Sequence, residues 1–294
     1  MSKPGVCIFG EVLFDHFPDG KRVLGGAPFN VAWHLQAFGQ APYFLSRVGN
    51  DAEGESIRNA MHEWGMDTRG LQTDGERPTG RVEVSFLDTE PVYDIVHPCA
   101  YDAIETDTET TTCNLLYHGS LCLRDIGSRQ TLAKLKTQHP KTIFVDVNLR
   151  PPWWRKEQVL DILQSAEWVK LNGAELKLLD VSNTSGHEQA RHFLKQHQLQ
   201  GLLLTHGARG AEVFTAAGEH LEIAPKTNIQ VADTVGAGDA FASVMILGLL
   251  KDWPILLTLQ RAQDFASEIV GQRGATVSDR AFYQSIENRW RKGA

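Results

Sequence analysis

Short apolar runs alternate along the chain with amphipathic stretches that have the spacing of helices. The runs are rich in Val, Ile and Leu and lack strict alternation with polar residues. That pattern is typical of a mostly parallel sheet covered by helices on both faces, so the predicted fold class is α/β. Ligands in such sheets bind at the carboxyl ends of the strands. The predicted strand and helix pairs are 6–9 with 28–38, 43–48 with 53–64, 115–118 with 128–138, 143–147 with 157–165, and 168–171 with 174–180, followed by a strand at 202–205.

Two places interrupt this rhythm with strand, turn and strand patterns. Runs at 12–17 and 21–24 flank Pro-Asp-Gly, and runs at 81–87 and 92–97 flank Asp-Thr-Glu-Pro. Residues 81–86 alternate polar and apolar, as expected for a sheet with one wet face. We interpret the two segments, about 12–24 and 80–98, as a small β lid inserted into the α/β body. Ordinary surface hairpins fit the same pattern.

Composition and charge narrow the choice of partners. The chain has 29 basic and 36 acidic residues, a formal charge of −7, and no long block of either sign. Nucleic acid is therefore an unfavourable partner. The N-terminus lacks a signal-peptide pattern, and the longest apolar stretch, 240–250, is too short to span a bilayer. We expect a cytoplasmic protein without a membrane partner. The four scattered cysteines are expected to be buried apolar residues.

The segment 233–239 reads Asp-Thr-Val-Gly-Ala-Gly-Asp and runs directly into an apolar stretch. Small residues leave the backbone N–H groups of Gly236, Ala237 and Gly238 unobstructed at the start of a buried helix. Such a helix N-terminus is an anion site suited to a phosphoryl group. Asp239 would then accept a proton from an attacking hydroxyl. A plain dipole partner at the first helical turn explains the same carboxylate.

A second glycine-rich segment, 25–32, reads Gly-Gly-Ala-Pro-Phe-Asn-Val-Ala. Paired glycines before a helix with Pro in its first turn let a ligand approach the backbone. Asn30 offers both a donor and an acceptor to hydroxyl groups. A tight turn and a helix start explain the glycines but not Asn30.

Together, these segments resemble the two signature motifs of the ribokinase-like, PfkB carbohydrate kinase family. The resemblance extends over essentially all 294 residues. It implies one kinase domain, 1–294, with a three-layer αβα core, a mostly parallel sheet and a small β lid. It also implies transfer of the γ-phosphoryl group of ATP to a sugar hydroxyl, with Asp239 as the base and Gly236, Ala237 and Gly238 as the anion hole.

Further positions are similar to the family's sugar-binding residues. The opening strand continues through Gly-Glu to Asp15, and the segment 146–154 is similar to an Asn-x-Arg element followed by Trp153. The resemblance assigns the sugar to Asp15, Gly25, Gly26, Asn30 and Arg150. An Arg at a strand end is a surface ion pair about as often as a ligand clamp.

Other positions resemble the family's nucleotide and metal sites. Residues 170–175 are similar to the Asn-x-x-Glu element, and 205–210 to the Thr-x-Gly-x-x-Gly turn, in which we interpret His206 as a solvent-facing turn residue. The nucleotide residues implied are Lys170, Asn172, Thr205, Gly207, Gly210, Ala262 and Ala266. Asn172 and Glu175 would hold Mg²⁺ through water, and Asp233, Thr234 and Gly274 an activating K⁺. Taken singly, Asn172 and Glu175 read as an ordinary helix start, and the two alanines as close helix packing.

The motifs look most like those of bacterial fructokinases, so D-fructose is the favoured substrate. Ribose, 2-keto-3-deoxygluconate and nucleoside kinases share the same frame and stay open as alternatives. A non-catalytic sugar or nucleotide sensor need not retain all these residues, and a Rossmann dehydrogenase would require a G-x-G-x-x-G fingerprint that is missing. Family members can pair through their lids, so the sequence leaves a monomer or a homodimer open.

Overall fold

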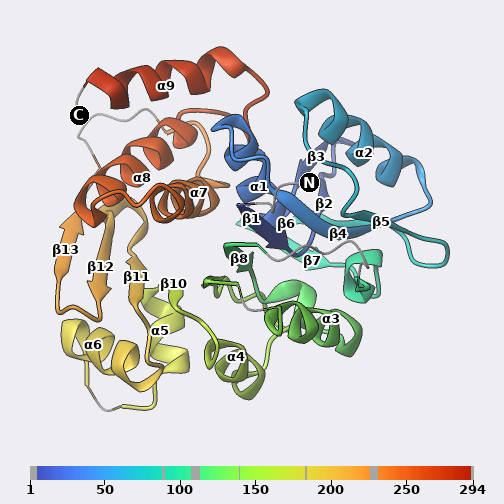
Figure 1. The fold of residues 1–294 in the computed structure, drawn as a ribbon. Coiled ribbons are helices and arrows are strands. Elements are labelled where there is room, and N and C mark those ends of the chain that lie inside the picture. The colour runs from blue at the N-terminus through green and yellow to red at the C-terminus, as the bar shows by residue number, and fades with distance from the viewer. Residues whose placement is uncertain are drawn as a thin grey trace.

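A mostly parallel sheet forms the centre of the protein. The computed structural model describes residues 5–87, 90–106, 113–138, 140–182, 184–225 and 231–292. Within them, a nine-stranded sheet has the order β13-β12-β11-β10-β9-β8-β1-β4-β5 (Figure 1). Pairing is parallel from β5 to β11 and antiparallel from β11 to β13. The bounds are β1 (Val6–Phe9), β4 (Tyr43–Gly49), β5 (Leu71–Asp74), β8 (Leu115–His118), β9 (Thr142–Asp146), β10 (Trp168–Asn172), β11 (Gly201–Thr205), β12 (Ala211–Thr215) and β13 (His220–Ile223).

Helices cover both faces of this sheet, because successive strand side chains point to opposite sides. In β1, Val6 and Ile8 belong to one buried apolar cluster, whereas Cys7 and Phe9 belong to another. The expected three-layer αβα fold is confirmed. The first cluster includes α1 (Ala27–Ala37), α2 (Ala52–Trp64), α7 (Ala237–Leu250), α8 (Ile255–Val270) and α9 (Arg280–Lys292), and the second includes α3 (Ile126–Lys136), α4 (Lys156–Leu163), α5 (Gly173–Leu179) and α6 (Gly186–Gln196).

A second, four-stranded sheet has the order β3-β2-β6-β7. Its strands are β2 (Leu13–His16), β3 (Arg22–Gly25), β6 (Gly80–Leu87) and β7 (Glu90–Ile95). Val82 and Val84 are buried while Glu83 and Ser85 are exposed, so β6 has the predicted wet face. The small sheet expected from the two interrupting segments is thus present. The predicted turn at 88–91 was partly wrong, since β7 already begins at Glu90; residues 88–89 lie outside the described residues.

The chain passes from β1 directly into β2, which brings the small sheet to the carboxyl end of the large one. Helix α7 supplies the most continuous buried run, with every residue from 240 to 248 buried. Among the described residues, no helix is both long enough and apolar enough to cross a membrane.

Candidate active site

The N-terminus of α7 has an open backbone because of the glycine that precedes it. Gly236 has φ +80°, and a Cβ there would lie 2.4 Å from Cβ of Ala275. Any larger residue would therefore clash and be strained. The helix begins at Ala237, whose N–H donates a long bond of 3.4 Å to the carbonyl oxygen of Thr234, and the next residue, Gly238, is exposed. This arrangement has the donors and the dipole direction of an anion site.

Asp239 stands in that first turn and is held by the other glycine-rich segment. Nδ2 of Asn30 donates a hydrogen bond of 2.8 Å to Oδ2 of Asp239. Burial raises the pKa of Asp239 to about 6, although the bond from Asn30 opposes the rise. Oδ1 of Asn30 is buried and has no hydrogen-bond partner among the described residues. The pair thus presents a carboxylate able to take a proton and an acceptor that a ligand hydroxyl would satisfy.

A buried lysine supplies positive charge beside the same helix turn. Nζ of Lys170 lies 2.7 Å from Oδ2 of Asp146 and 3.3 Å from where a Cβ on Gly238 would be. Burial alone would lower the pKa of Lys170, but the negative charge of Asp146 and its hydrogen bond have the larger effect, so the pKa is raised. Since Asp146 ends β9 and Lys170 lies in β10, neighbouring parallel strands create this pair. The predicted position of Lys170 near phosphate is consistent with this geometry. Asp146 received no role from the sequence.

The expected sugar residues gather around a second group of carboxyls. Burial raises the pKa of Asp15 to about 6 and that of Glu11 to about 7, in both cases against the charge of Arg150. Arg150 is exposed and also lowers the pKa of Asp239. The guanidinium of Arg150 therefore favours the charged form of all three carboxyl groups.

Gly25 lies close to the carboxylate of Asp15, and Gly26 lies close to the backbone of Glu11. A Cβ on Gly25 would lie 3.7 Å from Oδ2 of Asp15, and one on Gly26, which has φ +106°, would lie 2.7 Å from the Glu11 carbonyl oxygen. This close approach leaves no room for a side chain at Gly26. Gly26 also precedes the first residue of α1, the helix that carries Asn30.

Two buried groups near this space were missed by the sequence prediction. Oε2 of Glu11 and Nη1 of Arg124 have no hydrogen-bond partner among the described residues. The rest of the Arg124 guanidinium binds Asp102, through Nε at 2.6 Å, and lies 4.6 Å from the ring centre of Trp153. Arg124 also lowers the pKa of Glu11. No motif marks Arg124, which follows a short 3-10 helix, whereas Trp153 and Glu11 stood inside quoted motifs.

Asn172 and Glu175 form a capping box at the start of α5. Oδ1 of Asn172 accepts N–H bonds from Ala174 and Glu175, while Oε2 of Glu175 accepts one from Asn172. Oε1 of Glu175 accepts a further bond from Leu149. Burial raises the pKa of Glu175. The amide oxygen has used both lone pairs, but each carboxylate oxygen keeps one, which suits contact with a metal through water.

The remaining predicted residues are distributed around these groups. Thr205 lies opposite Asn172 in the β10–β11 register, at the same carboxyl edge. Gly207 and Gly210 both have positive φ, at +59° and +100°. These positions place the Thr205–Gly210 turn beside the capping box. Their role in nucleotide binding stays a prediction.

The predicted cation and adenine positions lie near the start of α7. Asp233 accepts backbone bonds from Val235 at 3.0 Å and Gly274 at 3.1 Å, so the loop before α7 is tied to the loop after α8. Thr234 is exposed in the same loop. Ala262 and Ala266 are buried in the core that includes α7. Their contact with adenine and the K⁺ site stay predictions.

His206 does not behave as the solvent-facing residue that the sequence suggested. Its Nε2 lies 2.7 Å from Oε1 of Glu212, and 20% of its side chain is exposed. The antiparallel pairing of β11 with β12 puts Glu212 opposite Leu204, next to the turn that carries His206. The turn is therefore tied to the sheet edge.

Comparison with known proteins identifies the class of this fold and site. Residues 9–281 match the pfkB family carbohydrate kinase model. The chain is 30% identical over 249 residues to a sugar kinase of Pyrococcus horikoshii, covering 81% of this chain and 75% of that protein. The chain therefore belongs to the PfkB family of carbohydrate kinases.

Solved structures agree in fold. A Xylella fastidiosa fructokinase with bound ATP superposes with a TM-score of 0.85 at 22% identity, over 98% of this chain and 99% of that chain. A Vibrio cholerae fructokinase with fructose, ADP and calcium superposes with a TM-score of 0.82 at 24% identity, over 96% and 98%. The ribokinase-like architecture is confirmed.

Proposed function

We propose that the protein transfers the γ-phosphoryl group of MgATP to a hydroxyl of D-fructose, giving fructose 6-phosphate, with Asp239 as the base. The observation that carries this proposal is the contact between Asn30 and Asp239, whose side chains meet at 2.8 Å although 209 residues separate them. It joins both glycine-rich segments beside the open start of α7. The sugar hydroxyl that accepts the phosphoryl group and the ATP that donates it would meet there.

The residues divide the reaction between them. Asp239 takes the proton of the sugar hydroxyl while that oxygen forms a bond to the γ-phosphorus and the bond to the β–γ bridging oxygen breaks, leaving ADP. The N–H groups at 236–238 and the ammonium of Lys170 stabilise the charge that develops on the phosphoryl oxygens. With a pKa of about 6, Asp239 is largely ionised at neutral pH and ready to accept the proton.

A magnesium ion would neutralise phosphate charge and orient the phosphoryl group. Glu175, supported by Asn172, would reach its water ligands, because each carboxylate oxygen has one acceptor position left. The Thr205–Gly210 turn, Lys170, Ala262 and Ala266 would line the nucleotide, and Asp233, Thr234 and Gly274 would hold K⁺. The small sheet, which carries Asp15, would close over the sugar and exclude water.

The preference for fructose depends on the sugar side of the site. Asn30 contacts Asp239, Arg150 lowers the pKa of Asp15, and the Arg124 guanidinium lies over the ring of Trp153, so these groups would contact the sugar. Two fructokinases share the fold over nearly the whole chain. Among the described residues, Arg124 and Glu11 each have one buried polar atom without a hydrogen-bond partner, so hydroxyls of a polar sugar would satisfy groups that a less polar ligand would leave unpaired.

A substrate panel tests this proposal. ATP-dependent phosphorylation is measured with fructose, ribose, 2-keto-3-deoxygluconate, glucose and adenosine, using wild type and Asp239→Asn. Preference for fructose and loss of turnover in the variant support both parts. Preference for another panel member keeps the mechanism and rejects fructose, whereas a wild type inactive on all five, or a variant as fast as wild type, rejects the proposed catalytic mechanism.

A further inference from the structure

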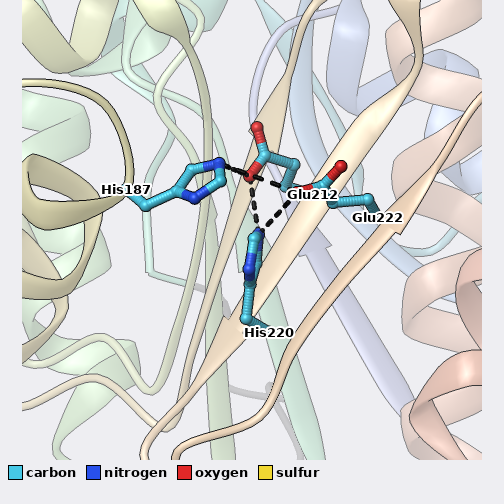
Figure 2. A group of neighbouring side chains, drawn as sticks. All are labelled: His187, Glu212, His220 and Glu222. Atoms are coloured by element: carbon cyan, nitrogen blue, oxygen red, sulfur yellow. Dashed lines mark hydrogen bonds and ion pairs between the residues drawn. The ribbon is translucent and has the colours of Figure 1, made fainter.

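A second cluster of ionisable side chains lies on the antiparallel edge of the large sheet. It consists of His187, Glu212, His220 and Glu222, whose nearest ligand atoms all lie within 4.8 Å of one another. Glu212 comes from β12, His220 and Glu222 from β13, and His187 from the first turn of α6. Figure 2 shows both imidazole rings pointing toward the two carboxylates. Three separate elements therefore converge on one point.

The strand register places two of these carboxylates next to each other, which is unfavourable for the stability of the sheet. Glu212 and Glu222 are direct partners across β12 and β13, so their side chains share one face. Like charges directly opposite each other on neighbouring strands destabilise a sheet. The cluster therefore needs positive charge beside the two carboxylates, and protonated histidines or a bound cation can supply it. A bound cation would do so with the histidines neutral, as metal ligands.

The distances match a tetrahedral metal site. Metal–ligand bonds of about 2.0–2.1 Å at tetrahedral angles put ligand atoms about 3.3 Å apart. Nε2 of His220 lies 2.7 Å from Glu212 Oε2 and 3.4 Å from Glu222 Oε1. Nε2 of His187 lies 3.0 Å and 3.7 Å from the same atoms. These four distances bracket the expected value, so an ion would fit with small side-chain movements.

The ligand types select the metal. Two imidazoles and two carboxylates suit zinc, whereas Mg²⁺ and Ca²⁺ prefer oxygen ligands only. His187 and Glu222 are 49% and 62% exposed, which leaves an entry path from solvent. His206 bonds to the other oxygen of Glu212 at 2.7 Å and would orient that carboxylate, as groups behind metal ligands commonly do.

A second histidine and carboxylate cluster shows why this one is favoured. His97, Asp102 and Asp125 also lie close enough to share an ion. However, both oxygens of Asp102 already accept bonds from the Arg124 guanidinium, at 2.6 Å and 2.9 Å. The guanidinium occupies the place that a cation would need. At the sheet edge, no Arg or Lys is paired with Glu212 or Glu222 among the described residues.

We propose that Nε2 of His187, Nε2 of His220, Oε2 of Glu212 and Oε1 of Glu222 bind one zinc ion, linking α6 to β12 and β13. The site lies outside the kinase centre, but Glu212 joins it to the Thr205–Gly210 turn through His206. Zinc binding would therefore fix that turn as well as the sheet edge.

Zinc titration of the chelator-treated, nucleotide-free protein tests the site. We expect one Zn²⁺ per chain in wild type and at least about tenfold weaker binding in the double variant His187→Ala, His220→Ala. His192→Ala is the matched control, because His192 also lies on α6 and pairs with a carboxylate, Asp180, but outside the cluster. Excess Mg²⁺ should not compete.

Two further readouts separate loss of the site from loss of fold. Zn²⁺ should raise the Tm of wild type and of His192→Ala but not of the double variant. The single variant His187→Ala alters a half-exposed side chain, so it keeps the test valid if the double variant does not fold. Co²⁺ should give tetrahedral visible absorption in wild type and in His192→Ala but not in the double variant. No stoichiometric zinc in wild type, or equal binding by the cluster variants, overturns the proposal.

Discussion

The start of α7 and the β12–β13 edge both hold carboxylates, but their surroundings act in opposite directions. Burial raises the pKa of Asp239 to about 6. At Glu212, burial also disfavours the charge, but hydrogen bonds from His220 and His206 outweigh it and hold the pKa below the usual range. One site keeps a carboxylate ready to take a proton, and the other keeps it ionised. Neighbouring groups, rather than residue type, decide which chemistry a carboxylate can perform.

Removal of the Asp239 carboxylate should have the largest effect on activity. Asp239→Asn keeps the shape and the contact with Asn30 but cannot accept the proton. We expect kcat to fall by about 10²–10⁴-fold with a smaller change in KM for the sugar. Steady-state kinetics measures both. Asp161→Asn, an exposed Asp on α4, should behave as wild type; equal loss in both variants would contradict a role specific to Asp239.

The sequence predicted the parts of this site that lie within continuous motifs. Small residues before an apolar run indicated the start of α7, and buried Val, Ile and Leu runs indicated the parallel strands. These signals are local, because helix starts and buried strands depend on neighbouring residues. The contact between Asn30 and Asp239 was not predicted; the family resemblance only assigned the two residues to one active site.

The missed features depend on which strands become neighbours. The Lys170–Asp146 pair requires β9 beside β10, and the Glu212–Glu222 pairing requires the β12–β13 register. The hydrophobic periodicity of a single segment predicts a strand but not which strands will lie next to it. Strand β12 contains Glu212, and β13 contains His220 and Glu222, so polar residues interrupt the apolar runs by which the other strands were predicted.

Loss of the hydrogen bond from Asn30 to Asp239 should reduce activity less than loss of the Asp239 carboxylate itself. Asn30→Ala removes a hydrogen bond to a charged group, and we expect kcat/KM to fall about 10–100-fold. Because that bond lowers the pKa of Asp239, its loss should also move the acidic limb of the kcat/KM profile above its wild-type position near pH 6. Asn114→Ala, at an exposed Asn, is the control. An unchanged limb would show that Asn30 does not act through Asp239.

The same exchange of carboxylate for amide should change stability in opposite directions at the two sites. The rise from 3.8 to about 6 for Asp239 corresponds to about 3 kcal/mol, reduced to about 1–2 kcal/mol by its partial exposure. At pH 7, Asp239→Asn should therefore stabilise the fold, whereas Glu212→Gln should destabilise it by about 1 kcal/mol. Denaturant unfolding with chelator present measures both, with exposed Glu63→Gln as control. If both substitutions changed the free energy of unfolding in the same direction, the two carboxylates would not differ in the way proposed.

The smallest effect concerns how Glu212 stabilises the fold as pH falls. A carboxyl whose pKa is depressed in the folded state binds its proton more readily when unfolded. Its contribution is fully present above the unfolded value of about 4.3 and is lost as pH falls through the lower folded value. The difference in unfolding free energy between metal-free wild type and Glu212→Gln should thus shrink as the pH falls below about 4.3. A difference that persists at lower pH would mean that Glu212 stabilises this edge by packing rather than by charge, and the case for a cation between the two carboxylates would weaken with it.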